Sequence, residues 1–167
     1  MEQRTAAEAG ALEFYNDWHR AYFERYSLPE EQRKFTAMPL EALKACEEDR
    51  GRHPVVILYN GEPAGFFVLH EGEGIAQFTE NKEAILLRAY SINSSYQGLG
   101  IATLSLRQLG GFVKRNFPGK TEIILAVNHA NLAAQHVYRK SGFVDRGRRI
   151  MGRMGEQYIL HMDLREA

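Results

Sequence analysis

The sequence predicts a mixed α/β fold in which helices flank a central mixed β-sheet. Three observations support this. A hairpin pattern covers residues 55–70, and two buried-strand runs, 84–92 and 121–127, are each followed by a segment with helical apolar spacing. Two further strand runs, 143–150 and 157–164, end the chain. A strand–helix–strand–helix order favours parallel pairing at the centre of the sheet.

Length and composition indicate one globular domain over residues 1–167. With 21 basic and 21 acidic residues the formal net charge is zero, which predicts neither a nucleic-acid partner nor a membrane-surface partner. No apolar run approaches the roughly 20 residues of a membrane span, and residues 1–5 lack a secretory pattern. Cys46 is the only cysteine, so we expect no internal disulfide and a cytoplasmic location.

The first fifty residues are predicted to be helical. Aromatic and apolar residues recur every three or four positions over 5–26, which favours an amphipathic helix whose rings pack in the core or wall a substrate cleft. Residues 30–37 suit a short helix or loop, and Pro39 suits the first turn of a helix to about Asp49. This region contains no predicted strand.

The next segment carries a strong turn signal. Asn60-Gly61 separates a strand run at 55–59 from a return strand at 64–70, as expected of a type I′ hairpin. Residues 71–82 are rich in glycine and polar side chains, so we expect a mobile loop or a ragged hairpin there.

A glycine-containing segment, QGLGIA at residues 97–102, joins the strand at 84–92 to a helix expected to end near Asn116. Glycines 98 and 100 permit positive φ, and a helix N-terminus offers N–H donors that suit phosphate oxygens. A dinucleotide fingerprint would require a third glycine where Thr103 stands, so a nicotinamide-cofactor enzyme is disfavoured.

A second motif follows the strand at 121–127. Asn131 is suited to cap a helix over 132–140, Tyr138 lies within that helix, and Gly142-Phe143 ends it. The spacing of these residues, together with Gln97-x-x-Gly-x-Ala, resembles the GNAT superfamily of acetyl-CoA-dependent N-acetyltransferases. The resemblance spans roughly residues 53–164.

This resemblance implies a GNAT-like fold with two splayed parallel strands and acetyl-CoA as co-substrate. It places Tyr138 as the general acid that protonates the departing CoA thiolate, and Asn131 beside the pantetheine arm. The pantetheine and pyrophosphate would bind to the backbone of Ile92, Gln97, Gly98, Leu99, Gly100, Ile101, Ala102 and Thr103.

The sequence leaves the roles of several other side chains undecided. Tyr138 alone would also fit a half-buried aromatic residue on an amphipathic helix. The base that deprotonates the amine has four candidates, none preferred, and Arg88 inside its strand faces either the acceptor cleft or an acidic neighbour. No histidine spacing predicts a metal site. The candidate bases are Glu24, Glu71, Glu73 and Glu83.

We therefore predict an enzyme that transfers the acetyl group of acetyl-CoA to a primary amine by direct attack. The aromatic N-terminal segment suggests a small, polyamine-like acceptor through cation–π contacts. Aminoglycosides, protein amines and a non-catalytic acetyl-CoA-binding module are the alternatives. Because members of the superfamily are often dimers, the resemblance also implies a homodimer.

Overall fold

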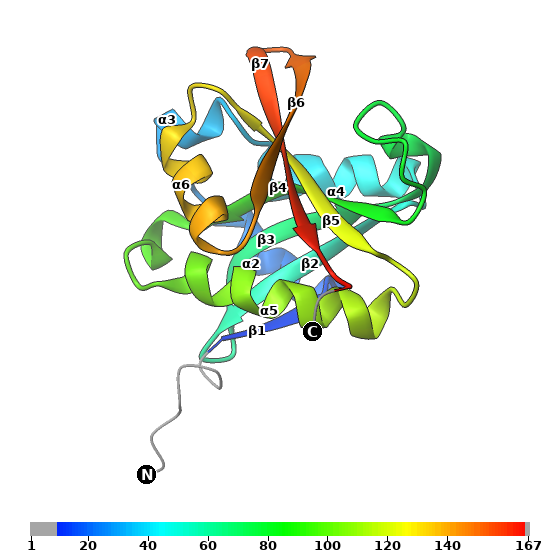
Figure 1. Ribbon diagram of the computed structural model, residues 1–167. Coiled ribbons are helices and arrows are strands. Elements are labelled where there is room, and N and C mark those ends of the chain that lie inside the picture. Colours follow the sequence, from blue (N-terminus) through cyan, green and yellow to red (C-terminus); the bar gives the residue numbers. More distant parts are fainter. Residues whose placement is uncertain (1–9, 166–167) are drawn as a thin grey trace.

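The computed structural model describes residues 10–165, and within them the chain forms one seven-stranded mixed sheet with helices on both faces (Figure 1). The strand order is β1-β2-β3-β4-β5-β7-β6. The strands are β1 (Gly10–Phe14), β2 (Arg52–Tyr59), β3 (Glu62–His70), β4 (Ala84–Ile92), β5 (Glu122–Asn128), β6 (Val144–Gly152) and β7 (Gly155–Asp163). The helices are α2 (Arg20–Glu24), α3 (Glu30–Arg33), α4 (Pro39–Glu48), α5 (Ile101–Asn116) and α6 (Leu132–Lys140), with 3₁₀ turns η1 (Asp17–His19), η2 (Gly72–Ile75) and η3 (Ser94–Tyr96).

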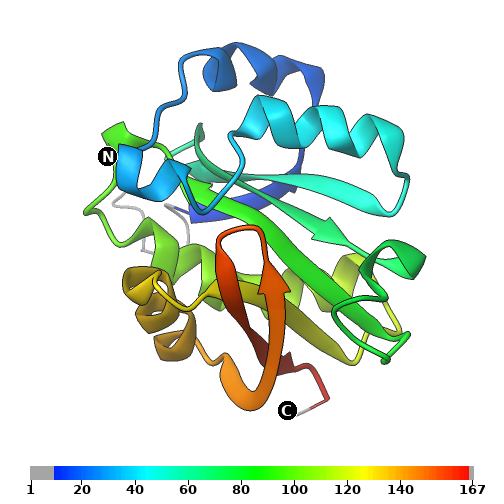
Figure 2. The same ribbon diagram turned by 90° about the horizontal axis from the view of Figure 1, so that it is seen from above.

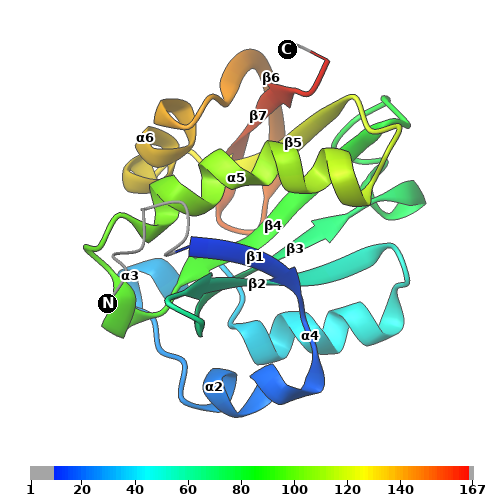
Figure 3. The same cartoon turned by 90° about the horizontal axis from the view of Figure 1, so that it is seen from below.

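The parallel pair at the centre of the sheet confirms the predicted fold class. Strands β1 to β4 pair antiparallel in sequence order, β4 pairs with β5 in parallel, and β5, β7 and β6 complete the sheet antiparallel. Helix α5 is the crossover between the two parallel strands and lies across one face of the sheet, as Figure 3 shows. Helices α2 and α4 cover the opposite face (Figure 2).

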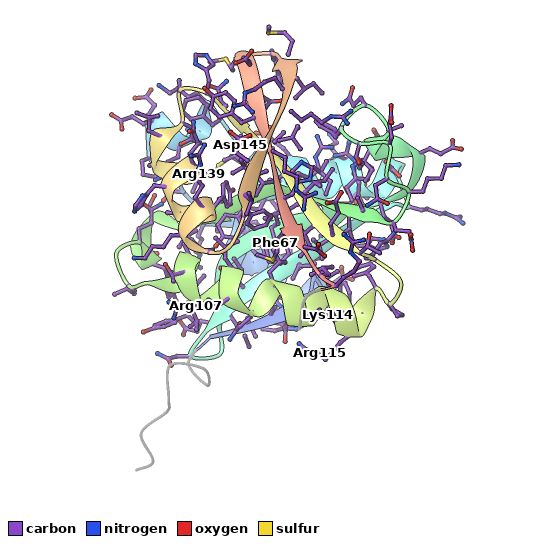
Figure 4. All side chains as sticks on the ribbon, viewed as in Figure 1. Phe67, Arg107, Lys114, Arg115, Arg139 and Asp145 are labelled. Carbon is purple, nitrogen blue, oxygen red and sulfur yellow. The ribbon has the colours of Figure 1, made fainter. Side chains whose placement is uncertain are left out.

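Both faces of the sheet are therefore buried, which explains why β3 and β5 are nearly continuous apolar runs. Phe67 of β3 packs with Leu106 and Leu109 of α5 in the larger core cluster, in the interior of the molecule (Figure 4). On the other face, Phe66 packs with Phe23 of α2 and with residues of α4. Successive residues of one strand thus supply two separate cores.

The two central strands separate along their length. Residues 84–86 of β4 pair with 122–124 of β5, but β4 continues to Ile92 and β5 to Asn128 without further pairing to each other. The carboxyl-terminal halves of both strands therefore border a gap in the sheet. This is the splayed arrangement that the sequence resemblance implies.

A β-bulge in β4 accompanies this separation. The register with β3 shifts between the pairs Phe66–Ser91 and Val68–Arg88, so two residues of β4 face a single residue of β3. One of the two, Ala89, has φ of 54°, an uncommon value for a residue with a side chain. A bulge bends its strand and interrupts the ladder of hydrogen bonds, which turns β4 away from its neighbour.

The predicted helix over residues 5–26 is wrong at residues 10–16, and so is the expectation that residues 1–50 contain no strand. Residues 10–14 form β1, which pairs with the edge of β2, and only 17–24 are helical; residues 5–9 lie outside the described part. Asn16 separates strand from helix by accepting a hydrogen bond from the backbone N–H of Asp17. Pairing with an open sheet edge outweighed the helical spacing.

Residues 71–82 form a loop and not the alternative hairpin. They contain η2 and fold back so that Ile75 and Phe78 are buried against Leu86 and Ile124. Elsewhere the predictions are confirmed. Asn60 and Gly61 both have positive φ, and Pro39 begins α4. Helices α5 and α6 end within a residue of the expected positions.

Candidate active site

A cavity of about 1090 Å³ occupies the gap between β4 and β5. Residues 86–92 of β4 and 125–128 of β5 line its middle. Its lining also includes residues of α3 and α4, the N-terminus of α5, one side of α6 and the turn between β6 and β7. Ligands of open α/β sheets bind at the carboxyl ends of parallel strands, and this cavity has that position.

The N-terminus of α5 presents unpaired backbone donors to this cavity. Gly98 and Gly100 have φ of 82° and 79°, and a Cβ atom at either would meet no atom within 4 Å. Gly100 is the N-cap without a side-chain hydrogen bond, and Leu104 N–H is the first to bond back to the Gly100 carbonyl. The N–H groups of residues 101–103 therefore have no intrahelical acceptor, and such a terminus can hold a phosphate.

Gln97 fixes the loop that leads into α5. Its side-chain Nε2 donates to the carbonyl of Ile92 at 2.9 Å and to Oε1 of Gln32 at 3.0 Å. One amide group thus ties the end of β4, the glycine loop and α3 together.

Asn131 begins α6 and lines the same cavity. Its Oδ1 accepts a hydrogen bond from the Ala134 N–H at 3.3 Å, which confirms the predicted helix cap. Gln135 supports this loop from within, since its Nε2 donates to the carbonyls of Asn128 and His129, each at 3.0 Å. Gln135 is buried, and sequence reasoning missed it because its role is visible only once the loop is folded.

Tyr138 lies on α6 with its ring between two other aromatic rings. The ring centroids of Tyr90 and Phe143 are 6.0 and 5.9 Å away. Tyr138 is half-buried and lines the cavity, and burial raises the pKa of its hydroxyl above the ordinary value. The side chain therefore packs in the core and also holds a proton at the cavity wall.

The structure brings nearly all of the sequence-predicted site residues around one cavity. Leu99 is the exception, because its side chain is 55% exposed and does not line the cavity. Those that line it are Ile92, Gln97, Gly98, Gly100, Ile101, Ala102, Thr103, Asn131 and Tyr138.

None of the four glutamates considered as bases lines the cavity. Glu71, for example, lies 2.8 Å from His53 Nε2 and 3.1 Å from Lys120 Nζ. Glu41, in the first turn of α4, is the acidic residue that lines it within residues 10–165. Its position depends on how the N-terminal helices dock, which the sequence pattern does not reveal.

Two further findings concern metal ligands and membrane spans. In the described part of the chain, no three His, Cys, Asp or Glu side chains are grouped so that they could hold a metal ion. No helix between residues 10 and 165 combines the length and the apolar character that crossing a membrane requires.

Comparison with known proteins identifies the class of protein. Residues 11–143 match the acetyltransferase (GNAT) family. The chain therefore belongs to the GNAT family and is an acetyl-CoA-dependent N-acetyltransferase.

The chain is similar to one curated relative in sequence and to several solved structures in fold. It is 42% identical over 152 residues to YbbJ of Bacillus subtilis (strain 168), an uncharacterized N-acetyltransferase, covering 90% of this chain and 95% of that protein. Its fold is similar to that of AAC(6′)-Ib in complex with paromomycin and acetyl-CoA (TM-score 0.75, 18% identity, 93% of each chain). It is also similar to spermidine N-acetyltransferase of Vibrio cholerae with CoA and spermine (TM-score 0.68, 17% identity, 93% and 96% of the two chains).

Proposed function

We propose that this enzyme acetylates the primary amine of a small molecule by direct attack on acetyl-CoA, with Tyr138 as general acid. The observation that supports this most is the single cavity through the open sheet. It joins a phosphate-sized set of backbone donors at α5 to the Tyr138 hydroxyl and to a further space beside α4. At about 1090 Å³ it is at the upper end of the range for small-molecule sites, as a cofactor arm plus an acceptor would require.

In this proposal the pyrophosphate of acetyl-CoA rests on the N–H groups of residues 97–103. The positive end of the α5 dipole and the free donors of its first turn favour that charge. The pantetheine arm enters the gap between β4 and β5 near Ile92 and Asn131. Gln97 acts indirectly, because its amide already holds the loop in shape.

The reaction then needs two proton movements. The uncharged amine attacks the thioester carbon, a C–N bond forms and the C–S bond breaks, and the thiolate takes a proton. Tyr138 supplies that proton, since a tyrosine hydroxyl is protonated at neutral pH and Tyr138 lines the cavity. The amine must first lose a proton, because an alkylammonium has a pKa of about 10.4.

A small-molecule acceptor is supported by the named acceptors of the structural neighbours, aminoglycosides and spermine. A polyamine-like acceptor remains a prediction, and the mostly basic side chains on the cavity wall weigh against it. Acetylation of protein amines remains the alternative. A cytoplasmic location and a homodimer are also predictions, the first supported by the single cysteine.

The test is release of free CoA thiol, followed with a chromogenic thiol reagent, over a panel of amines. We expect turnover with at least one small primary amine and none without amine. Tight acetyl-CoA binding by calorimetry without turnover on any amine would instead support a non-catalytic binding module. Turnover only on peptides would instead indicate that the acceptor is a protein amine.

A further inference from the structure

The cavity wall beside α4 carries an arginine whose charge the protein does not pair directly. Arg88 of β4 is half-buried, and within the described residues 10–165 no carboxylate lies at ion-pairing distance from its guanidinium. A buried cation without a partner is costly, so such groups usually meet an anion. Arg88 lines the cavity, and an anion in the cavity can reach it.

A fixed network holds this arginine in place. The Arg88 Nη1 donates to Nδ1 of His70 at 3.1 Å, and because a guanidinium only donates, Nδ1 must accept. Nε2 of His70 then carries the hydrogen and donates to Oδ2 of Asp49 at 2.8 Å. His70 is 1% exposed, so it orients Arg88 and has no access to a substrate itself.

The Asp49 carboxylate interacts with groups other than Arg88. Its Oδ1 accepts from the Gly51 N–H at 2.9 Å, and its Oδ2 meets His70 and lies 3.6 Å from Nε of Arg52. Burial and the nearby Arg52 lower the pKa of Arg88, with Asp49 only partly opposing them. The remaining N–H groups of Arg88 are thus available on its cavity side.

The CoA phosphates do not account for this charge. Arg88 precedes Ile92, the end of β4, by four residues, and the bulge at Ala89 lies between them. The N-terminus of α5 lies beyond Ile92, and the proposed pyrophosphate lies with it. Arg88 instead pairs with Val68 of β3, whose side chain packs toward α4, and bonds to His70 on the same face of the sheet, so its side chain lies on the α4 side.

Most of the charged side chains that line the cavity are basic. Among the described residues, five basic side chains and one acidic side chain line the cavity, which is an unfavourable surface for a polycation and a favourable one for an anion. They are Arg33, Lys34, Arg52, Arg88, Arg153 and Glu41.

We propose that the acceptor amine carries an oxyanion, a carboxylate or a phosphate, which binds the free face of the Arg88 guanidinium. A planar guanidinium matches the geometry of these groups with parallel hydrogen bonds. This inference rests on the proposed acetylation of a small amine and specifies its substrate class. The anion would hold the acceptor at one end while its amine reaches the thioester.

The first test compares amines that differ only in the anion. Glycine, β-alanine, 4-aminobutyrate and L-lysine are measured beside their decarboxylated counterparts, methylamine, ethylamine, propylamine and 1,5-diaminopentane. O-phosphoethanolamine beside ethanolamine tests phosphate. We expect the higher kcat/KM with an anionic member, and the preferred pair tells carboxylate from phosphate.

Preference for the decarboxylated amines would overturn the inference while leaving the proposed acetylation intact. Absence of turnover with every anionic amine would overturn it as well. In that case turnover on the decarboxylated amines and the diamine decides separately whether small-amine acetylation stands.

The second test changes Arg88 itself. Arg88→Gln should raise KM for the preferred anionic amine about ten- to hundredfold, leave KM for acetyl-CoA unchanged and spare its decarboxylated counterpart. Arg88→Lys should recover part of the loss. Arg107→Gln, on the outer side of α5 away from this cavity (Figure 4), is the matched control and should change neither KM.

Comparing two acceptors within one variant removes any effect of partial unfolding. An equal loss for both members of a pair would overturn the role of Arg88 in binding the anion. A rise confined to KM for acetyl-CoA would assign Arg88 to the cofactor and would overturn it too.

Discussion

At the residue scale, Tyr138 shows how one side chain can serve packing and chemistry together. Its ring contacts Tyr90 and Phe143, which any aromatic residue at this position could do. The residue also lines the cavity, and burial raises the pKa of its hydroxyl. The packing role belongs to the ring and the proposed acid role to the oxygen, so a substitution can separate them.

Tyr138→Phe keeps the ring and removes the proton donor. We expect kcat to fall about a hundredfold, in the range typical of a general acid, with little change in acetyl-CoA affinity or melting temperature. Steady-state kinetics and calorimetry measure the two effects. Tyr59→Phe removes a tyrosine hydroxyl outside the cavity and should leave kcat unchanged. Wild-type turnover in Tyr138→Phe would remove Tyr138 from the mechanism.

At the element scale, the N-terminus of α5 depends on glycine for two separate reasons. Gly100 has φ of 79°, which costs a residue with a side chain about 1 to 2 kcal/mol. The space where its Cβ would lie is open and belongs to the cavity. A substitution there should strain the turn and also fill the place of the proposed phosphate.

Gly100→Val should therefore abolish acetyl-CoA binding measured by calorimetry. Gly119 is a suitable control, because it also has positive φ and open space around its Cβ position but does not line the cavity. Gly119→Val should lose comparable stability and keep its affinity. If Gly100→Val still bound acetyl-CoA normally, the pyrophosphate would have to rest elsewhere.

At the scale of the whole molecule, the two halves of the sheet are joined by only a short stretch of pairing between β4 and β5. Between β4 and β5 the paired register covers only three residues of each strand, and the cavity separates the rest. A ligand that fills this gap contacts both parts of the sheet. We expect it to stabilise the fold as a unit.

Acetyl-CoA at a hundred times its Kd should add about 2.7 kcal/mol to the free energy of unfolding. For a domain of this size the melting temperature should rise by about 5 to 10 °C, measured by differential scanning calorimetry. The Gly100→Val protein should show no rise. Equal stabilisation of both proteins would indicate binding outside the proposed site.

Much of the secondary structure could be predicted from the sequence, because residues close together in the chain determine it. Asn60-Gly61 requires a tight turn, Pro39 begins a helix, and Asn131 caps one, each through its own backbone or side-chain chemistry. The helix predicted over residues 10–16 is wrong for the opposite reason. Residues 10–14 have helical spacing with their neighbours, but the open edge of β2 offers them backbone partners from far along the chain.

The sequence by itself determined the mixed fold, the glycine loop before α5, the cap of α6 and the residues of the proposed cofactor site. Those features depend on residues close together in the chain. The tertiary structure alone decided the bulge at Ala89, the cavity between β4 and β5, and the network of Asp49, His70 and Arg88. These features join residues from separate elements of the chain, and only folding brings their charges and hydrogen bonds together.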